Sequence, residues 1–226
     1  MSLTYYVFPD HYGSLYENYL ETKDMIGLFE EKYGAYPFFD EKYGHAEFGW
    51  GGGMEHQTLS SMGGWSDWLI AHELAHQWWG DMITCADFHH IWLNEGFARY
   101  GEALWAEYDE GIDAYHTYWA NHAYYGGGTV IVENTTTVSE IFNGQLTYNK
   151  AGWVVHMLRH VVGDDVFFNM LNAYANNDSL KYASATTEDF RDVCEDFTGL
   201  DLHDFFDQWI YGERYPRYRV LYDTSP

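Results

Sequence analysis

The chain has 226 residues, enough for one large domain or two small ones, and 20% of them are aromatic, as in a packed globular protein. Its formal net charge of −24 argues against nucleic acid as a partner, because such a surface repels phosphates. No run of 18 apolar residues occurs, so the sequence predicts no membrane span. We interpret the charge as a solvated acidic surface, with attraction of cations and of protonated peptide N-termini as the alternative.

The first 65 residues have the pattern of a small α/β subdomain. Residues 15–33 have the apolar spacing of an amphipathic helix, which the stretch around Pro37 interrupts. Apolar and polar residues then alternate around positions 46–48 and again over 54–62, on either side of a run of three glycines at 51–53. Two extended segments around a glycine run predict the edge of a sheet, where a substrate could bind.

From residue 66 the pattern becomes mainly helical, with helices predicted at 66–80, 92–108, 111–124, 147–162, 164–176, 187–197 and 201–211. We therefore predict an α+β fold, in which a small mixed β-sheet is followed by a mainly helical bundle. Residues 66–214 would form this helical subdomain. Residues 215–226 alternate like a strand that has no partner segment, so we expect them to lead toward a following domain.

The two cysteines, Cys85 and Cys194, are expected to be buried free thiols, with a single disulfide as the alternative. They do not decide the cellular compartment.

His72, Glu73 and His76 form the pattern His-Glu-x-x-His in the predicted helix 66–80, and Glu95 follows nineteen residues after His76. Residues four apart lie on one face of a helix, so both imidazoles can bind the same metal ion. Two histidines and a carboxylate are the ligands of a catalytic zinc that keeps one position open for water. The pattern predicts one zinc ion held by His72, His76 and Glu95, between the sheet and the bundle. Glu73 would be free to act as general base on the water.

The surroundings of this motif strengthen the interpretation. The segment 66–80 is apolar on several sides and therefore predicts a buried helix, with apolar side chains at Trp68, Leu69, Leu74, Trp78 and Trp79. Two buried histidines and a glutamate are costly unless something compensates them, and a metal ion is the simplest compensation. His156 and His160 are also four apart but have no neighbouring Glu, so we interpret them as helix-packing or surface histidines.

Two further stretches accompany the metal motif. Residues 52–56 read Gly-Gly-Met-Glu-His, and residues 148–151 read Tyr-Asn-Lys-Ala. In this order, and with Glu95 in the stretch Trp-Leu-Asn-Glu-Gly-Phe-Ala, the three motifs resemble the gluzincin zinc aminopeptidases of the aminopeptidase N type, whose relatives include leukotriene hydrolase. The resemblance covers nearly the whole chain and implies the thermolysin-like catalytic domain. It also implies a β-rich domain before this region and further domains after it in the parent protein.

This resemblance implies a zinc metallopeptidase that hydrolyses the first bond of peptides with a free N-terminus. Residues Gly52, Gly53, Met54 and Glu55 would bind the substrate, with its backbone along the glycine edge and its α-ammonium on Glu55. His56 stands where the family usually has Asn, but Glu55, the charged member of the motif, is retained. An ordinary solvent-facing strand glutamate is the alternative for Glu55.

Two other roles follow from the resemblance. Tyr148 would donate a hydrogen bond to the developing oxyanion of the scissile carbonyl, with a core tyrosine as the alternative. Glu102 lies seven residues after Glu95 on the same helix face and could accept a proton from the non-ligating nitrogen of a zinc-bound histidine. A surface glutamate is the alternative for Glu102.

Three functions can be weighed for the whole site. The leading one is a zinc aminopeptidase catalytic domain, and the second keeps the zinc but hydrolyses an epoxide, as leukotriene hydrolase does. The third is a non-catalytic scaffold that retains the fold, which the intact set of ligands and base disfavours. Peptide and epoxide assays separate the first two, and zinc content separates both from the third.

Overall fold

A computed structural model describes residues 1–13, 16–215 and 219–222 of the chain. A four-stranded mixed sheet forms its N-terminal part, in the order β1 (Ser2–Tyr6), β2 (Lys42–Glu47), β4 (Ser60–Met62), β3 (Gly53–Met54). The first three of these strands are parallel neighbours, and β3 pairs antiparallel with β4 at one edge. The two residues of β3 belong to the glycine-rich segment for which the sequence predicts an edge.

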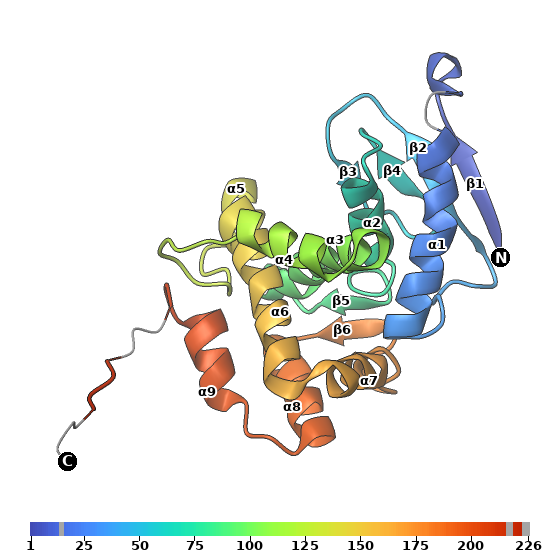
Figure 1. Cartoon of the computed structure of the whole chain (residues 1–226). Coiled ribbons are helices and arrows are strands. Elements are labelled where there is room, and N and C mark those ends of the chain that lie inside the picture. The colour runs from blue at the N-terminus through green and yellow to red at the C-terminus, as the bar shows by residue number, and fades with distance from the viewer. Residues whose placement is uncertain (14–15, 216–218, 223–226) are drawn as a thin grey trace.

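Helices make up most of the rest (Figure 1). They are α1 (Tyr16–Tyr33), α2 (Asp67–Ala75), α3 (Trp92–Glu110), α4 (Ile112–Asn121), α5 (Val138–Ile141), α6 (Ala151–Val162), α7 (Asp164–Ala175), α8 (Thr187–Thr198) and α9 (His203–Phe206). Two π-helical turns, Gly144–Lys150 and Asp207–Tyr211, and two short 3₁₀ turns, Pro9–His11 and Phe88–His90, complete them. A second, two-stranded parallel sheet joins β5 (Ile83–Cys85) to β6 (Ala183–Ala185).

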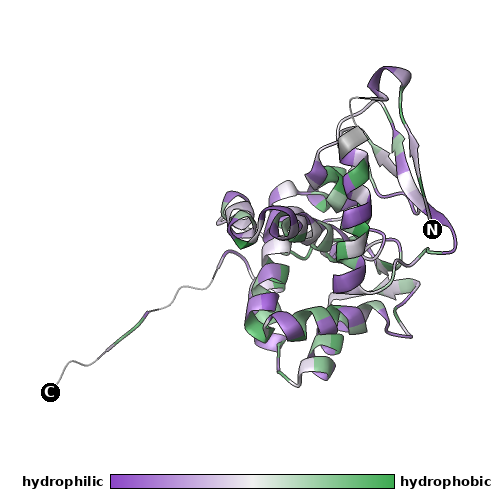
Figure 2. Cartoon of the chain, turned by 45° about the vertical axis from the view of Figure 1, so that its right-hand side comes forward, coloured by the Kyte–Doolittle hydropathy of each residue, from purple (hydrophilic) through white to green (hydrophobic). Residues whose placement is uncertain are grey.

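Helix α3 lies at the centre of the helical part, where it is buried along most of its length and packs against α2, α4 and α6 (Figure 1). Gly101 allows its close approach to α2, because an added Cβ would lie 2.7 Å from the Cβ of Ala75. The outer helices have both hydrophilic and hydrophobic residues along their length (Figure 2), as expected of amphipathic helices that cover a core. The chain thereby holds α2 and α3 at a fixed separation.

The predicted α+β fold, with a small mixed sheet followed by helices, is confirmed. The predicted helix 66–80, however, ends at Ala75, with His76 as its cap. Beyond that point the backbone N–H groups of residues 81–83 donate to carbonyls five residues earlier, so the chain continues in wider turns. Gly80, the last residue of the predicted range, lies within these turns at a positive φ of 146°.

Three strands have no clear signal in the sequence: β1, β5 and β6. The predicted strand at 215–226 falls mostly outside the described residues, and residues 219–222 have no regular secondary structure. Cys194 is buried as predicted, but Cys85 is only half-buried, and both thiols are free. None of the helices in the described part of the chain is long and apolar enough to cross a membrane.

Candidate metal centre and substrate pocket

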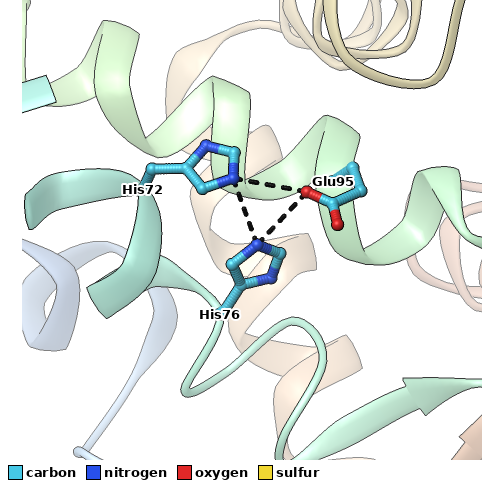
Figure 3. Close-up of side chains that lie close together, drawn as sticks. All are labelled: His72, His76 and Glu95. Carbon is cyan, nitrogen blue, oxygen red and sulfur yellow. Dashed lines mark hydrogen bonds and ion pairs between the residues drawn. The ribbon is translucent and has the colours of Figure 1, made fainter. Parts of the chain in front are cut away.

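His72, His76 and Glu95 point toward one another from α2 and α3 (Figure 3). The Nε2 atoms of the two histidines are 3.2 Å apart, and each lies 3.3 Å from Oε2 of Glu95. The histidines meet because they are one helical turn apart, and Glu95 reaches them from the first turn of α3. The three atoms form a nearly equilateral triangle.

The other ring nitrogen of each histidine has a hydrogen-bond acceptor. Nδ1 of His72 lies 2.7 Å from Oε1 of Glu102, and Nδ1 of His76 lies 3.1 Å from the carbonyl oxygen of Trp79. Both acceptors favour the tautomer with a proton on Nδ1, which leaves a lone pair on each Nε2.

This donor set fits a zinc ion. Two imidazole lone pairs and a carboxylate oxygen converge with no hydrogen-bond donor between them, so a cation is the species that satisfies all three. A tetrahedral ion with bonds of about 2.0–2.1 Å has its ligand atoms roughly 3.3 Å apart, as in this triangle. Among the residues that the structure describes, His156 and His160 belong to no group of three such ligands. His156 instead makes a 2.7 Å hydrogen bond with the hydroxyl of Tyr115.

The electrostatics of the cluster favour positive charge. Burial lowers the pKa of His72, but hydrogen bonds to Glu102 and Glu95 outweigh it and raise that pKa to about 9. Burial raises the pKa of Glu95, but the neighbouring His76 and His72 hold it well below its usual range. Glu102 also accepts from Arg99 at 3.0 Å and from the hydroxyl of Tyr118 at 2.8 Å. The carboxylates therefore surround a place where a cation is stabilised.

Glu73 lies beside the triangle but outside it. Its side chain is 4% exposed, and its Oε2 has no hydrogen-bond partner among the described residues. Burial raises its pKa to about 7, so this carboxyl can hold or release a proton near neutral pH. The carboxylate packs against Gly53 of β3, where any Cβ would overlap it. A glycine at this position is what gives Glu73 its room.

A cavity of about 430 Å³ opens over the triangle and is lined by Gly52, Gly53, Glu55, Ser66, Trp68, Leu69, His72, Glu73, His76, Glu95, Arg99, Glu102 and Tyr148. Glu55 is half-buried, with a carboxylate oxygen within 4.8 Å of ligand atoms of Glu73 and His76. The ring of Tyr148 stacks on that of His72, with centroids 5.9 Å apart. Burial and the carboxylates of Glu95 and Glu55 raise the pKa of Tyr148 well above its usual range, so its hydroxyl keeps its proton.

The structure thus brings nearly all of the predicted site residues to one cavity. Met54 is the exception, since it does not line the cavity and its side chain is 41% exposed. His56 is exposed as well, with Nδ1 3.0 Å from the hydroxyl of Ser61. Sequence reasoning missed four lining residues: Ser66, Trp68, Leu69 and Arg99. The spacing of Arg99, four residues after Glu95, is the signal that could have found it.

Comparison with known proteins adds to this geometry. Residues 55–209, more than half of the chain, match the Peptidase family M1 domain. Aminopeptidase M1 of Arabidopsis thaliana is 31% identical over 160 residues, which are 66% of this chain and 18% of that protein. Aminopeptidase M1-B of Oryza sativa subsp. japonica is 28% identical over 228 residues, covering 93% of this chain and 24% of that protein. The chain therefore spans about a fifth of the length of the curated relatives that it matches.

A crystal structure of an M1 zinc metallopeptidase mutant from Deinococcus radiodurans, bound to a Tyr-Ser-Ala substrate, is also similar. It superposes with a TM-score of 0.74 at 29% identity, over 87% of this chain and 45% of that one. The family resemblance seen in the motifs is confirmed, and the chain belongs to peptidase family M1.

Proposed function

We propose that this chain is the catalytic region of a zinc-dependent aminopeptidase. The observation that carries the proposal is the triangle of His72, His76 and Glu95, with the unpaired carboxylate of Glu73 beside it in an open cavity. Aminopeptidase relatives and a zinc metallopeptidase structure with a bound peptide support it.

One zinc ion per chain would be held by His72, His76 and Glu95. Zinc bound there supplies a Lewis acid that polarises a carbonyl group and lowers the pKa of a coordinated water. Glu102 and the carbonyl of Trp79 orient the two imidazoles from outside.

Glu73 is the general base in this proposal. It takes a proton from the attacking water as the C–O bond forms and passes it to the leaving amine as the C–N bond breaks. Its place in the cavity wall, buried and with Oε2 unpaired among the described residues, leaves the carboxylate free for both proton transfers.

Tyr148 stabilises the tetrahedral oxyanion. Its hydroxyl remains protonated at neutral pH and its ring stacks on that of His72, next to the metal triangle, so it can donate a hydrogen bond to a negative charge that develops there.

Glu55 would bind the free α-ammonium of the peptide and so place only the first peptide bond at the metal. Its carboxylate lies close to the carboxylate of Glu73 and to the imidazole of His76, and the adjacent glycines leave backbone groups open for an extended substrate. Residues 1–65 then act as the subdomain that supplies the binding edge, and residues 66–214 as the one that supplies ligands and base.

The proposal can be tested on the zinc-loaded chain by elemental analysis and by hydrolysis of leucine 4-nitroanilide, a free-amine substrate. We expect one zinc per chain, and a higher KM in Glu55→Ala for free-amine substrates only. Glu31→Ala, on the exposed face of α1, is the matched control. Efficient hydrolysis of N-acetylated peptides, unaffected by Glu55→Ala, would contradict the role of Glu55. Hydrolysis of an epoxide but not of any peptide would contradict the proposed reaction.

A further inference from the structure

We propose that Arg99 binds the C-terminal carboxylate of short peptides, so that the pocket prefers tripeptides over longer chains. This inference rests on the proposed function, because it requires a peptide whose amine lies at Glu55. It concerns the opposite end of the substrate from the one that Glu55 would bind.

The side chain of Arg99 is held in the wall of the site by its neighbours. It follows Glu95 by one turn of α3, and its side chain lines both the 430 Å³ cavity and a neighbouring one of about 700 Å³. Its aliphatic stem lies against Gly152 of α6, where an added Cβ would come within 2.9 Å of Cγ of Arg99. Its guanidinium carbon lies 5.7 Å from the ring centroid of Tyr148.

The guanidinium is held in place and still has donors to spare. Nη1 donates to Glu102 at 3.0 Å and to the hydroxyl of Tyr118 at 3.3 Å. Nε is buried and has no partner among the described residues. Because a guanidinium carries five N–H donors and Nη1 uses two of them, Nη2 can still donate to an oxygen of a second carboxylate.

Arg99 and Glu55 lie next to different metal ligands. Glu55 neighbours Glu73 and His76, whereas Arg99 is connected through Glu102 to His72. Among the residues described, Arg99 is the only Lys or Arg that lines the cavity over the metal site. A cavity lined by a carboxylate near His76 and by a guanidinium linked to His72 matches the two charges of a zwitterionic peptide.

The distances favour a short one. Arg99 is two hydrogen bonds away from the ring of His72, and an extended peptide advances about 3.3–3.6 Å per residue. The carboxylate of a tripeptide lies roughly 7 Å beyond its first carbonyl, which suits that separation. Further along, the second cavity is lined by Glu110 and Asp113, and Glu110 is about 16 Å from Arg99 along α3. These acids repel the carboxylate of a longer peptide.

The test compares Leu-Ala-Ala with its C-terminal amide, which differs from it only in the terminal charge. In the zinc-loaded chain we expect kcat/KM to favour the free acid roughly tenfold to hundredfold, as expected of a charge-assisted hydrogen bond. Arg99→Gln should abolish this preference for the free acid over the amide, and Arg99→Lys should retain part of it. Arg191→Gln, in α8 and outside the cavity, should leave the ratio unchanged.

Calorimetric binding of the same two peptides to the zinc-loaded Glu73→Gln chain separates this inference from the proposed function. If leucine 4-nitroanilide is not hydrolysed, the peptidase proposal fails, but a tighter binding of the free acid that depends on Arg99 still supports the site. Equal binding of acid and amide, or tighter binding of the amide, would overturn it.

Discussion

At the scale of single residues, Glu73 is the group whose replacement should separate metal binding from turnover. Glu73→Gln keeps the size of the side chain but removes the proton acceptor, so zinc content should stay at one per chain while kcat falls by at least about 10²-fold. Elemental analysis and initial rates measure the two effects. Glu31→Gln, far from the cavity, is the control. Loss of zinc from Glu73→Gln would instead make Glu73 part of the metal centre.

Tyr148 should act on the transition state alone. Tyr148→Phe keeps the ring that stacks on His72 and removes only the hydroxyl. We expect kcat to fall about 10²–10³-fold with little change in KM, the pattern of an interaction made mainly in the transition state. Tyr125→Phe, whose side chain is exposed, should change neither constant. A rise in KM alone would show that Tyr148 binds the ground state and has no role at the oxyanion.

At the scale of elements, the contact between α2 and α3 decides whether the ligands meet. Gly101→Ala would push the two helices apart, because the new Cβ lies 2.7 Å from the Cβ of Ala75, next to His76. We expect a loss of roughly 1–3 kcal/mol in the free energy of unfolding, together with weaker zinc affinity. Gly27→Ala, in α1 with open space at its Cβ, should be neutral or slightly stabilising. Chemical denaturation and competitive chelation provide the two measurements, and an unchanged zinc affinity in Gly101→Ala would refute the coupling.

The sequence predicts what depends on local spacing. The pair His72 and His76, and the face shared by Glu95 and Glu102, follow from helical periodicity, so both appear without a structure. The pairing of β5 with β6 joins segments a hundred residues apart, and each strand has three residues, too few for an alternation to show. Arg99 was missed for a related reason: the cavity that gives it a role forms only where α2, α3, the glycine edge at 52–53 and the π-helical turn with Tyr148 come together.

The wider turns after Ala75 also escaped prediction. The apolar spacing through Trp78 and Trp79 continues as in a helix, and only the hydrogen-bond pattern departs from it. Helix propensity and apolar periodicity do not tell whether a backbone N–H donates to the carbonyl four or five residues earlier, because both hydrogen-bond patterns bury the same side chains.

At the scale of the whole molecule, the metal should stabilise the fold. Its three ligands come from two helices, and an ion that binds only the folded chain adds its binding free energy to stability. Removal of zinc by a chelator should therefore lower Tm, and added zinc should restore it. Chelation should lower the Tm of His72→Ala far less than that of the parent chain. If chelation lowered both Tm values equally, the stabilising ion would be bound elsewhere.

His45 should make the fold sensitive to acid. Burial in the sheet lowers the pKa of His45 to about 3, so the folded chain keeps it neutral while the unfolded chain binds a proton below about 6.5. Protonation of His45 in the unfolded chain therefore costs the fold nothing above pH 6.5. Below that pH it lowers the free energy of unfolding by about 1.4 kcal/mol per pH unit, down to about pH 3. His45→Gln should flatten this slope in denaturation curves at pH 5 and 7, whereas His116→Gln, on the surface, should not.

The shortness of β3 has a consequence for self-association. An exposed sheet edge offers unpaired N–H and C=O groups to any extended chain, including a second copy of the same protein. With only Gly53 and Met54 in the strand, the edge offers too few of these groups to template a stack of sheets, but enough to pair with a peptide that charged groups also hold. A longer, flatter β3 would bind extended chains less selectively and would expose the protein to aggregation.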